Sequence, residues 1–257
     1  TISREYPCHY VLVGRSPDPS GHPPDEFQAI TDKHLIRQKL IASGKYSTPK
    51  EIEDDVQKIY KSNQAMDTIE SLRRNGAQTS YYSVDLRDAD AVDKLIDDLT
   101  ATHGKIDGVI HAAGFLDDKF FSNKSLESFQ HVYATKTTPL FVLARKLSEH
   151  TQFMILFSSI ASAVGNKGQV DYSAANSALD AYAQAFGSKG IPRIISINWG
   201  PWKGSGMVSP SLEKEYNKRG IGLIPMEAGA ELFLNELKYG KESQVMFMAG
   251  DPNKFSN

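Results

Sequence analysis

One short stretch, residues 157–176, carries side chains whose types and spacing suit proton transfer. It reads FSSIASAVGNKGQVDYSAAN, so an apolar run ends in two serines, and Tyr172 precedes Asn176 by one helical turn. Side chains four residues apart project from one face of a helix. A phenol is protonated at neutral pH, so Tyr172 can donate a proton to a developing alkoxide. Ser159, at the end of the apolar run, can hold a carbonyl oxygen beside it.

A nearby cation would tune this tyrosine, because a positive charge lowers the pKa of a phenol. Lys136 is a candidate, since it lies inside ATKTTPLF, an otherwise weakly charged segment. Each residue also has a plain structural interpretation: a tyrosine packed at a helix start, a serine in a turn, a lysine on a solvated face. Taken singly, those interpretations are favoured. Only the combination indicates chemistry.

The elements that must position these residues follow from the pattern of apolar side chains. Strands are predicted at 9–14, 79–86, 106–114, 153–159 and 193–200. Helices are predicted between them at 90–104, 125–147 and 173–190, two of which end at Gly104 and Gly190, as a glycine cap requires. Near-continuous apolar strands that alternate with helices are typical of a parallel sheet covered on both faces. The predicted fold class is therefore α/β, with a doubly wound, Rossmann-like parallel sheet.

The interval between Arg15 and Asp85 is far longer than the roughly 30 residues of a βαβ unit. A capping pattern at Thr48, Pro49 and Glu51 predicts a helix over 47–60, and a second helix is predicted over 66–76. Residues 17–62 are therefore predicted to form a helical insertion packed against the sheet. It could be a docking surface, although a decorated loop is the simpler interpretation.

Doubly wound sheets bind ligands at the carboxyl ends of their strands. Arg15 and Ser16 follow the first predicted strand, and an arginine there accommodates a ribose 2′-phosphate, which favours NADPH over NADH. Asp85, followed by Leu86, ends the next strand and can accept from an adenine amino group. Small side chains at the end of the third strand let a backbone approach a cofactor. They form the turn His111, Ala112, Ala113 and Gly114.

The glycine-rich loop that cradles a pyrophosphate belongs before the strand at 9–14, and the sequence does not show it there. TISREY, residues 1–6, is typical of the tail of the helix that such a loop would open. The chain also begins with Thr and ends in PNKFSN. The first strand and glycine loop are thus expected to be absent from this chain, which is interpreted as a piece of something longer.

Composition narrows the classes of function. The chain has 257 residues, 40% of them apolar and 23% charged, which suits one large core. A net charge of −2 gives no reason to expect nucleic acid as a partner. The single cysteine, Cys8, excludes an internal disulfide, offers no metal cluster and fits a cytoplasmic location. No apolar run approaches the ~18 residues of a membrane span.

Three segments together resemble a known family. HAAGFLDDK, FSSIASAVGNKGQVDYSAANSALDAYA and INWGPW resemble the short-chain dehydrogenase/reductase superfamily and, within it, the ketoreductase domains of type I polyketide synthases. The resemblance covers most of residues 7–238. It implies NADPH-dependent reduction of a β-ketoacyl thioester tethered to an acyl carrier protein, beside neighbouring megasynthase domains. The long insertion and the segment after residue 205 look most like ketoreductases of polyunsaturated-fatty-acid synthases and related iterative or trans-acyltransferase systems.

The resemblance also implies roles for individual residues. Tyr172 would be the proton donor and Ser159 the carbonyl partner, with Lys136 and Asn176 completing a tetrad. In ordinary members of the superfamily the lysine sits four residues after the tyrosine, where this chain has Asn176, and this exchange is typical of the polyketide branch. The INWGPW strand end adds further residues to the cofactor site. These are Asn198, Gly200 and Pro201.

Two further segments refine the expected reaction. Leu116, Asp117 and Asp118 resemble the LDD motif of the subtype that gives a D-configured hydroxyl, and residue 164, where the opposite subtype has Trp, is Val. Residues 203–225 look like a substrate lid with Met207 near the entry. A helix in this lid carries three cations that could meet an acidic carrier protein, although such charges are more often only solvated. They are Lys214, Lys218 and Arg219.

Two alternatives stay open beside a single catalytic domain over 1–257. The first is a catalytically silent scaffold domain: the absent glycine loop favours it, whereas Tyr172, Ser159 and Asn176 count against it. The second is a free-standing reductase of a small ketone, against which the cut-looking termini and Asn176 in the lysine position count. A metal-dependent or nucleophilic hydrolase built on His111 is poorly supported, and no metal, nucleic acid or membrane partner is expected.

Overall fold

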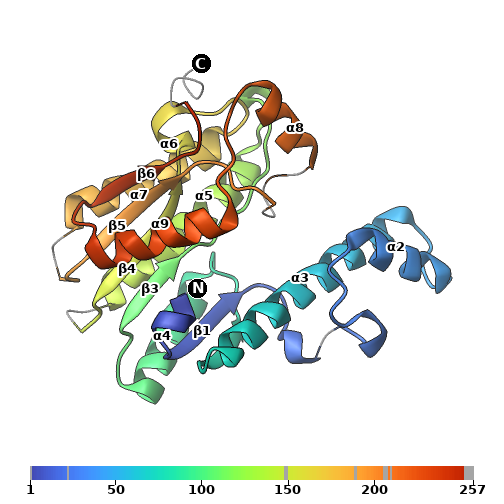
Figure 1. The fold of residues 1–257 in the computed structure, drawn as a ribbon, viewed down its shortest axis with the longest axis horizontal. Helices are drawn as coiled ribbons and strands as arrows, with labels where there is room; N and C mark the ends of the chain where they lie inside the picture. Colours follow the sequence, from blue (N-terminus) through green and yellow to red (C-terminus); the bar gives the residue numbers. More distant parts are fainter. Residues whose placement is uncertain are drawn as a thin grey trace. The chain divides into compact units, whose positions relative to one another are not determined.

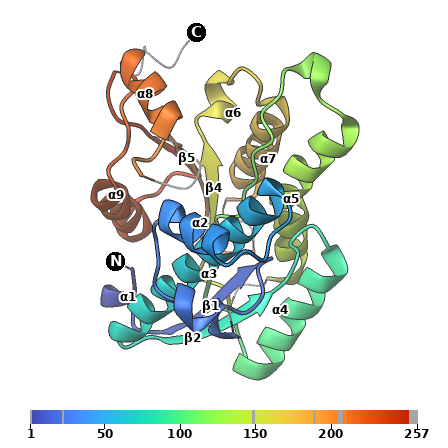
Figure 2. The ribbon, with the colours of Figure 1, turned by 90° about the vertical axis from the view of Figure 1, so that its right-hand side faces the viewer.

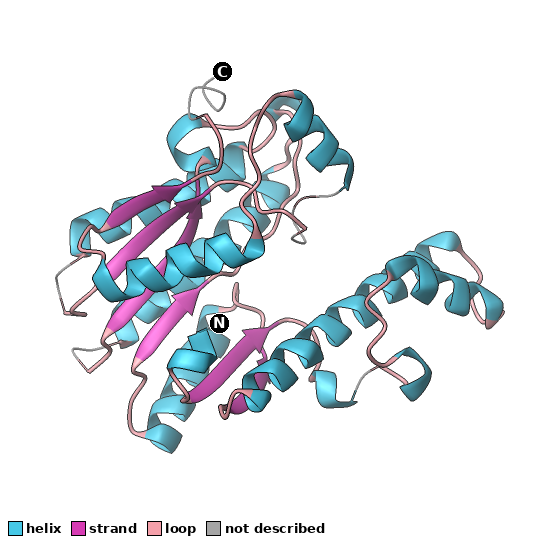
Figure 3. Cartoon of the chain, viewed as in Figure 1, coloured by secondary structure: helices cyan, strands magenta, loops and turns pink. Residues whose placement is uncertain are grey.

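The structure is a computed structural model and describes residues 2–21, 23–147, 150–187, 190–204, 208 and 210–251. It divides into two compact units, Thr1–Asp85 and Leu86–Asn257. Each unit combines parallel strands with helices, as Figures 1 and 3 show. None of the described helices is long and apolar enough to cross a membrane.

The first unit holds a two-stranded parallel sheet. The strands β1 (His9–Gly14) and β2 (Gln78–Ser83) pair in register from His9 opposite Gln78 to Gly14 opposite Ser83. A short helix precedes β1, as the residues TISREY predicted. The helices of this unit are α1 (Ile2–Glu5), α2 (Lys33–Ala42) and α3 (Pro49–Arg74), with single 3₁₀ turns η1 (Pro19–Gly21) and η2 (Asp25–Phe27).

The predicted capping box at the start of α3 is confirmed. The hydroxyl of Thr48 accepts from the backbone N–H of Glu51, and the Glu51 carboxylate accepts from the backbone N–H of Thr48. The two helices predicted over 47–60 and 66–76 are, however, one continuous helix. The residues between them, KSNQA, contain no glycine or proline that would end a helix, so the chain runs straight through.

The predicted insertion, residues 17–62, has its own small core and also reaches the sheet of the first unit, since Asp18 and Ser20 line one pocket with Thr79 and Tyr81 of β2. Apolar side chains of α2 and η2 form a small core with the first half of α3, and the second half of α3 contacts β2 (Figure 1). The buried amide of Asn63 fastens the preceding loop, because its Nδ2 donates to the carbonyl oxygens of Phe27 and Ile30 at 2.7 and 2.8 Å. The core consists of Phe27, Ile36, Leu40 and Val56.

The second unit holds a four-stranded, all-parallel sheet in the order β3-β4-β5-β6. Helices α5 and α7 lie on one face of this sheet and α9 on the other, as the two views of Figures 1 and 2 show. The strands are β3 (Gly108–His111), β4 (Phe153–Ser159), β5 (Ile194–Trp199) and β6 (Gln244–Phe247). The helices are α4 (Ala89–His103), α5 (Leu126–Lys146), α6 (Ala161–Val164), α7 (Val170–Phe186), α8 (Pro210–Lys218) and α9 (Met226–Tyr239), with one 3₁₀ turn η3 (Phe121–Asn123).

Alternate residues of the central strands face opposite layers of helices. Leu156 of β4 packs with Leu140 of α5 and Leu179 of α7, whereas the next residue, Phe157, contacts Phe233 of α9 with ring centroids 5.7 Å apart. Both faces of the strand are therefore buried, which explains its continuous apolar sequence. Burying each such side chain contributes about 1.5–3 kcal/mol. This packing fixes the carboxyl ends of β4 and β5, where Ser159 and Gly200 lie.

The parallel α/β class and the five predicted strands are confirmed, with small changes at their ends. Gly104 caps α4 with a φ of 79°, as predicted. Helix α7 ends at Phe186, ahead of the predicted end at Gly190. Strand β6 and helix α9 are not among the elements predicted from the sequence. Strand β6 has only four residues and lies at the edge of the sheet, so its apolar pattern is too short to stand out.

Candidate active site

A cavity of about 500 Å³ opens at the carboxyl ends of β4 and β5 in the second unit. Ser159 and Gly200 come from the two strand ends, Tyr172 from the first turn of α7, and Lys136 from the middle of α5. The opposite wall is mostly apolar. It includes Val208, Leu212, Tyr216, Ile221 and Met226. The fold thus brings three residues of the predicted tetrad to one cavity from three separate elements.

Lys136 is buried beside Tyr172. Its Nζ donates to the carbonyl oxygen of Phe157 at 2.7 Å and lies 5.7 Å from the centre of the Tyr172 ring, within range of a cation–π interaction. Burial lowers the pKa of Lys136 from 10.5 to about 8, and the negative charge of Asp180 partly opposes this shift. At neutral pH the side chain is therefore still mostly cationic, as a partner of a proton-donating phenol must be.

The hydroxyl of Tyr172 is held in its protonated form. Burial raises the pKa of Tyr172, while the side chains of Asn176 and Ser159 counteract this rise and the charge of Asp118 adds to it. Asn176 lies one turn further along α7, fully buried, and its Nδ2 donates to the carbonyl oxygen of Tyr172 at 2.7 Å. Asn176 therefore supports Tyr172 from within the helix, whereas Tyr172 itself lines the cavity.

Ser159 is set up to donate a hydrogen bond. Its Oγ accepts from the backbone N–H of Ala161 at 3.2 Å, so its own O–H can point to an acceptor in the cavity. The serine sits at the last position of β4, where the chain turns into α6. Together, Ser159 and Tyr172 offer two donors to a single oxygen atom, which is the arrangement that stabilises a developing alkoxide.

His111 fastens β3 to α5. Its Nε2 lies 2.8 Å from the carbonyl oxygen of Lys136, and because a carbonyl can only accept, Nε2 carries the proton. Burial, and then the charge of Lys136, lower the pKa of His111 to about 4, so the ring is neutral at pH 7. Ala112, the next residue, lines the cavity, and Ala113 and Gly114 follow it. His111 thus holds the backbone of Lys136.

Asn198, predicted to bind the cofactor, has its side chain in a buried polar network below the cavity. Its Nδ2 donates to the carboxylate of Asp180 at 2.8 Å and to Ser162 Oγ at 2.7 Å, and its Oδ1 accepts from Gln244 at 2.8 Å. Asp180 also accepts from Ser196 at 2.5 Å. The network links β5, β6, α6 and α7. It is the two neighbouring predicted residues, Gly200 and Pro201, that line the cavity.

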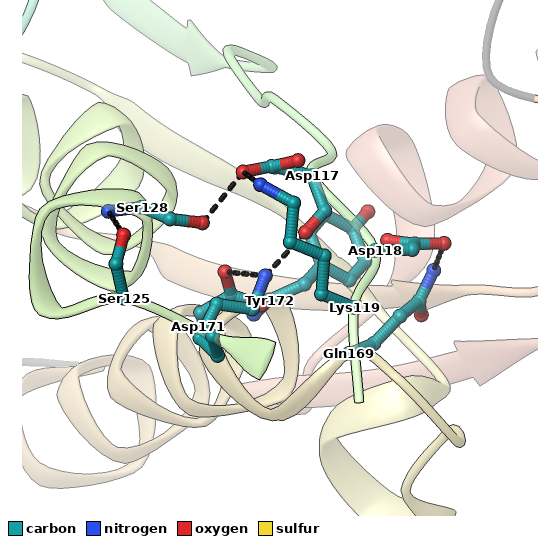
Figure 4. Close-up of polar contacts among 9 residues, drawn as sticks. Asp117, Asp118, Lys119, Ser125, Ser128, Gln169, Asp171 and Tyr172 are labelled. Atoms are coloured by element: carbon teal, nitrogen blue, oxygen red, sulfur yellow. Dashed lines mark hydrogen bonds and ion pairs between the residues drawn. The ribbon is translucent and has the colours of Figure 1, made fainter. Parts of the chain in front are cut away.

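The three residues of the LDD motif do not act alike. Leu116 and Asp118 line the cavity, and Gln169 Nε2 donates to Asp118 Oδ2 at 2.9 Å. Asp117 points to α5, where its Oδ2 accepts from Ser128 Oγ at 2.5 Å (Figure 4). The same Oδ2 atom accepts from Lys119 Nζ at 2.8 Å. The Asp118 carboxylate of the motif therefore lies at the cavity, whereas the Asp117 carboxylate anchors the loop that carries the motif.

In the first unit, the predicted cofactor residues gather at the carboxyl edge of the β1–β2 sheet. Arg15 and Ser16 directly follow β1, and Asp85 follows β2 by two residues. The hydroxyl of Tyr81 donates to the carbonyl oxygen of Ser16 at 3.0 Å, which fixes the chain as it leaves β1. Leu86 is the first residue of the second unit.

Two predictions concern the 203–225 segment. Met207 lies outside the described residues. Lys214 and Lys218 lie on α8, four residues apart, but Arg219 falls one residue past its end and lines the cavity, which corrects its predicted place on the helix. Arg219 therefore belongs to the site and not to the outer face of α8.

Sequence reasoning missed the aromatic floor of the cavity. The Trp199 and Trp202 rings lie 4.7 Å apart, and Trp199 also contacts Phe157 at 5.5 Å. A Cβ atom at Gly229 of α9 would lie 2.2 Å from the Trp202 ring, so a glycine is required there. INWGPW carries both tryptophans, but only the tertiary structure shows that the Trp202 ring packs on Gly229 of α9.

Comparison with known proteins identifies the family. Residues 30–204, more than half of the chain, match the family model described as the KR domain. The chain therefore belongs to the KR domain family, ketoreductases of the short-chain dehydrogenase/reductase fold. The resemblance noted from the sequence is confirmed. With the family come a reductive role and a nicotinamide cofactor.

Curated relatives are much longer proteins. The chain is 32% identical over 232 residues to one component of the polyunsaturated fatty acid synthase of Thraustochytrium sp., a match that covers 86% of the chain and 8% of that protein. It is 34% identical over 192 residues to polyketide synthase PksN of Bacillus subtilis, covering 71% of the chain and 3% of that protein. The chain thus spans less than a tenth of the length of these relatives.

Solved structures of ketoreductases are similar to this chain in fold. The ketoreductase PlmKR1 from the first module of phoslactomycin biosynthesis in Streptomyces sp. HK803 is 30% identical, with a TM-score of 0.69 over 74% of this chain and 44% of that one. A ketoreductase domain from the bacillaene assembly line is 26% identical, with a TM-score of 0.66 over 97% of this chain and 58% of that one. The Rossmann-like fold is therefore that of polyketide-synthase ketoreductases.

Proposed function

We propose that this chain reduces the β-keto group of an acyl thioester, carried on an acyl carrier protein, to a hydroxyl group with NADPH as the reductant. The observation that carries the proposal is the convergence of Tyr172, Ser159 and Lys136 on one cavity. The reaction adds a hydride to the β-carbon and a proton to its oxygen. The nicotinamide, when bound, supplies the hydride.

The chain's own residues supply the proton and hold the oxygen. Tyr172 donates its phenolic proton to the oxygen as negative charge develops there. Ser159 donates a hydrogen bond to the same oxygen. The cation of Lys136, over the Tyr172 ring, stabilises the phenolate that remains, and Asn176 keeps the tyrosine backbone in place.

Each unit, taken by itself, carries residues of the kinds that the proposed cofactor needs. In the cavity, Ala112 and Gly200 have no bulky side chain that would exclude a planar ring. In the first unit, exposed Arg15 stands at the carboxyl end of β1 and would pair with a ribose 2′-phosphate. Arg15 is the reason for proposing NADPH over NADH. We propose that Asp85 accepts from the adenine amino group.

The proposed product carries a D-configured hydroxyl. Leu116 and Asp118 of the LDD motif line the cavity, and so does Val164, at the position where the opposite subtype carries a tryptophan. A tryptophan at residue 164 would fill part of the cavity that a valine leaves to the substrate. The proposed product follows from these three residues together.

The substrate lid and the carrier-protein partner are proposed from the residues of α8. Leu212 and Tyr216 of α8 line the cavity from the side opposite the strand ends, so this segment would cover an acyl chain. Exposed Lys214 and Lys218 share one face of α8 and would meet the acidic surface of a carrier protein. We further propose a cytoplasmic megasynthase with neighbouring domains as the context.

The test is NADPH oxidation with a β-ketoacyl N-acetylcysteamine thioester, with NADH in parallel. The protein used carries a glycine-rich loop ahead of β1, because a Rossmann-like fold binds the cofactor's pyrophosphate with such a loop. Turnover should be lost in Tyr172→Phe and kept in Tyr182→Phe, a matched change on the same helix whose ring stacks on Phe186. Binding of NADPH without turnover in the parent protein would favour the silent scaffold instead.

A further inference from the structure

Beside the proposed active site, Lys124 and Asp171 form a deeply buried ion pair. Lys124 Nζ lies 2.7 Å from Asp171 Oδ2, and the two side chains are only 3% and 1% exposed. The Arg193–Glu236 pair, by comparison, is 21% and 12% exposed. Taking two charges out of water costs more than it commonly returns in stability. The pair therefore needs an explanation other than stabilisation of the fold.

The pair connects two segments that both reach the cavity. Lys124 Nζ also donates to the carbonyl oxygen of Asp117, in the middle of the 116–118 segment. Asp171 is the second residue of α7, and its Oδ1 accepts the backbone N–H of Tyr172 at 2.9 Å (Figure 4). One carboxylate therefore holds the backbone of the proton donor and, through Lys124, the backbone of the LDD motif.

Two further contacts join the same segments. The backbone N–H of Lys119 donates to the carbonyl oxygen of Gly168 at 3.0 Å, and Gln169 Nε2 donates to Asp118 Oδ2 at 2.9 Å. Gly168 and Gln169 directly precede α7. The 116–119 loop is thus attached along its length to the start of the helix that carries Tyr172, with Lys124–Asp171 as the charged, buried attachment.

We propose that Lys124 and Asp171 are positioning residues, which hold Leu116 and Asp118 at a fixed place relative to the Tyr172 hydroxyl and thereby fix the face of the substrate carbonyl that is reduced. Neither residue is among those that line the cavity, so both act through Tyr172, Leu116 and Asp118. The inference rests on the proposed reductase function. It extends that function to a pair that contacts no substrate.

The test compares Lys124→Met, Asp171→Asn and the double variant. Each single variant leaves one buried charge without its partner and should lower the unfolding temperature, whereas the double variant removes both charges and should recover it. The ratio of D- to L-3-hydroxy product, measured by chiral chromatography, should fall on the order of tenfold in all three, since the attachment is lost in all three. The double variant thereby separates positioning from stability.

Hydrogen exchange supplies a second measurement that does not depend on activity. Peptides that cover residues 116–124 should exchange faster in all three variants than in the parent. Lys105→Met is the matched control, because Lys105 pairs with Asp107 at 2.6 Å in an exposed ion pair just before β3, and it should change neither exchange nor product ratio.

The outcomes distinguish the two proposals. A parental product ratio in the double variant, once its unfolding temperature has recovered, would overturn the positioning role, and so would parental exchange of 116–124 in all three variants. Absence of turnover in the parent protein would instead overturn the proposed function, with the exchange of 116–124 still deciding whether the ion pair holds the loop.

Discussion

The ammonium of Lys136 lies 5.7 Å from the centre of the Tyr172 ring, and both side chains belong to the same cavity. Thirty-six positions separate the two residues in the chain, and they come from different helices, α5 and α7. Burial pulls the pKa of Lys136 down from 10.5 to about 8 and pushes the pKa of Tyr172 up from 10.0, so the two values move apart. Pairs of titratable groups whose environments push their pKa values apart are expected where one of the two acts as the acid.

The buried charge of Lys136 should cost stability. Its pKa in the folded chain, about 8, lies below the ordinary 10.5, so between these pH values the unfolded chain holds a proton that the folded chain has released. Stability therefore rises with pH in that window. Lys136→Met should raise the free energy of unfolding at pH 6 by about 1–2 kcal/mol, net of the lost hydrogen bond to Phe157, and the gain should vanish near pH 10.

Urea denaturation at pH 6 and pH 10 measures this change in the free energy of unfolding. In the same variant, the rate of NADPH oxidation should fall about 100-fold or more. Lys146→Met, which removes a cation paired with Asp93 and Asp97 at the surface, is the control and should show no such gain. A loss of stability in Lys136→Met at pH 6 would contradict the prediction.

His111 should make the protein sensitive to acid. Its pKa in the folded chain, about 4, lies below the ordinary 6.5, so in this window the unfolded chain binds a proton that the folded chain excludes, and stability is lost as pH falls. His111→Gln keeps a donor for the carbonyl oxygen of Lys136 but cannot titrate. Between pH 7 and pH 4 the parent should lose up to about 3 kcal/mol more than this variant.

Denaturation curves at pH 7, 5 and 4 measure the difference, because the carboxylates that titrate in the same range are common to both proteins. His103→Gln, at the exposed end of α4, serves as the control and should follow the parent. Equal losses in the parent and in His111→Gln would show that the imidazole is not what titrates.

Val164 should help to set the configuration of the product. Its side chain lines the cavity, so Val164→Trp places a large ring where part of the substrate would lie. The ratio of D- to L-3-hydroxy product should fall on the order of tenfold, equivalent to about 1.4 kcal/mol between the two transition states. Val164→Leu is the conservative control, expected to retain the parental ratio in the same chiral chromatography. A parental ratio in Val164→Trp would remove residue 164 from the site.

The two faces of α8 should have different roles. Lys214→Glu with Lys218→Glu should raise KM several-fold for a carrier-bound substrate, because the reversed charges repel an acidic partner, and should leave KM for a free thioester unchanged. Leu212→Asp, on the cavity side, should raise KM for both substrates. Steady-state kinetics with the two substrates measures this. An equal effect of the charge reversals on the free thioester would rule out docking at this face.

Local patterns allowed much of the fold to be predicted. The capping residues around Thr48 and the glycine after α4 act through contacts within a few residues, so their roles hold whatever surrounds them. The predicted break in α3 was wrong for a local reason, since no glycine or proline between its halves ends the helix. The direction of the Asn198 side chain could not be predicted, because it depends on a distant contact with the carboxylate of Asp180 on α7.

By itself, the sequence determined most of the elements, the parallel α/β class and the identities of the candidate donors, because periodicity and side-chain chemistry are local properties. Tertiary structure alone decided that Lys136 meets Tyr172, that Asp118 lines the cavity while Asp117 anchors its loop, and that Lys124 pairs with Asp171. These relationships depend on where β3, β4 and β5 end beside one another. Parallel strands bring together residues that the chain keeps far apart, and burial then sets the charge that each of them carries.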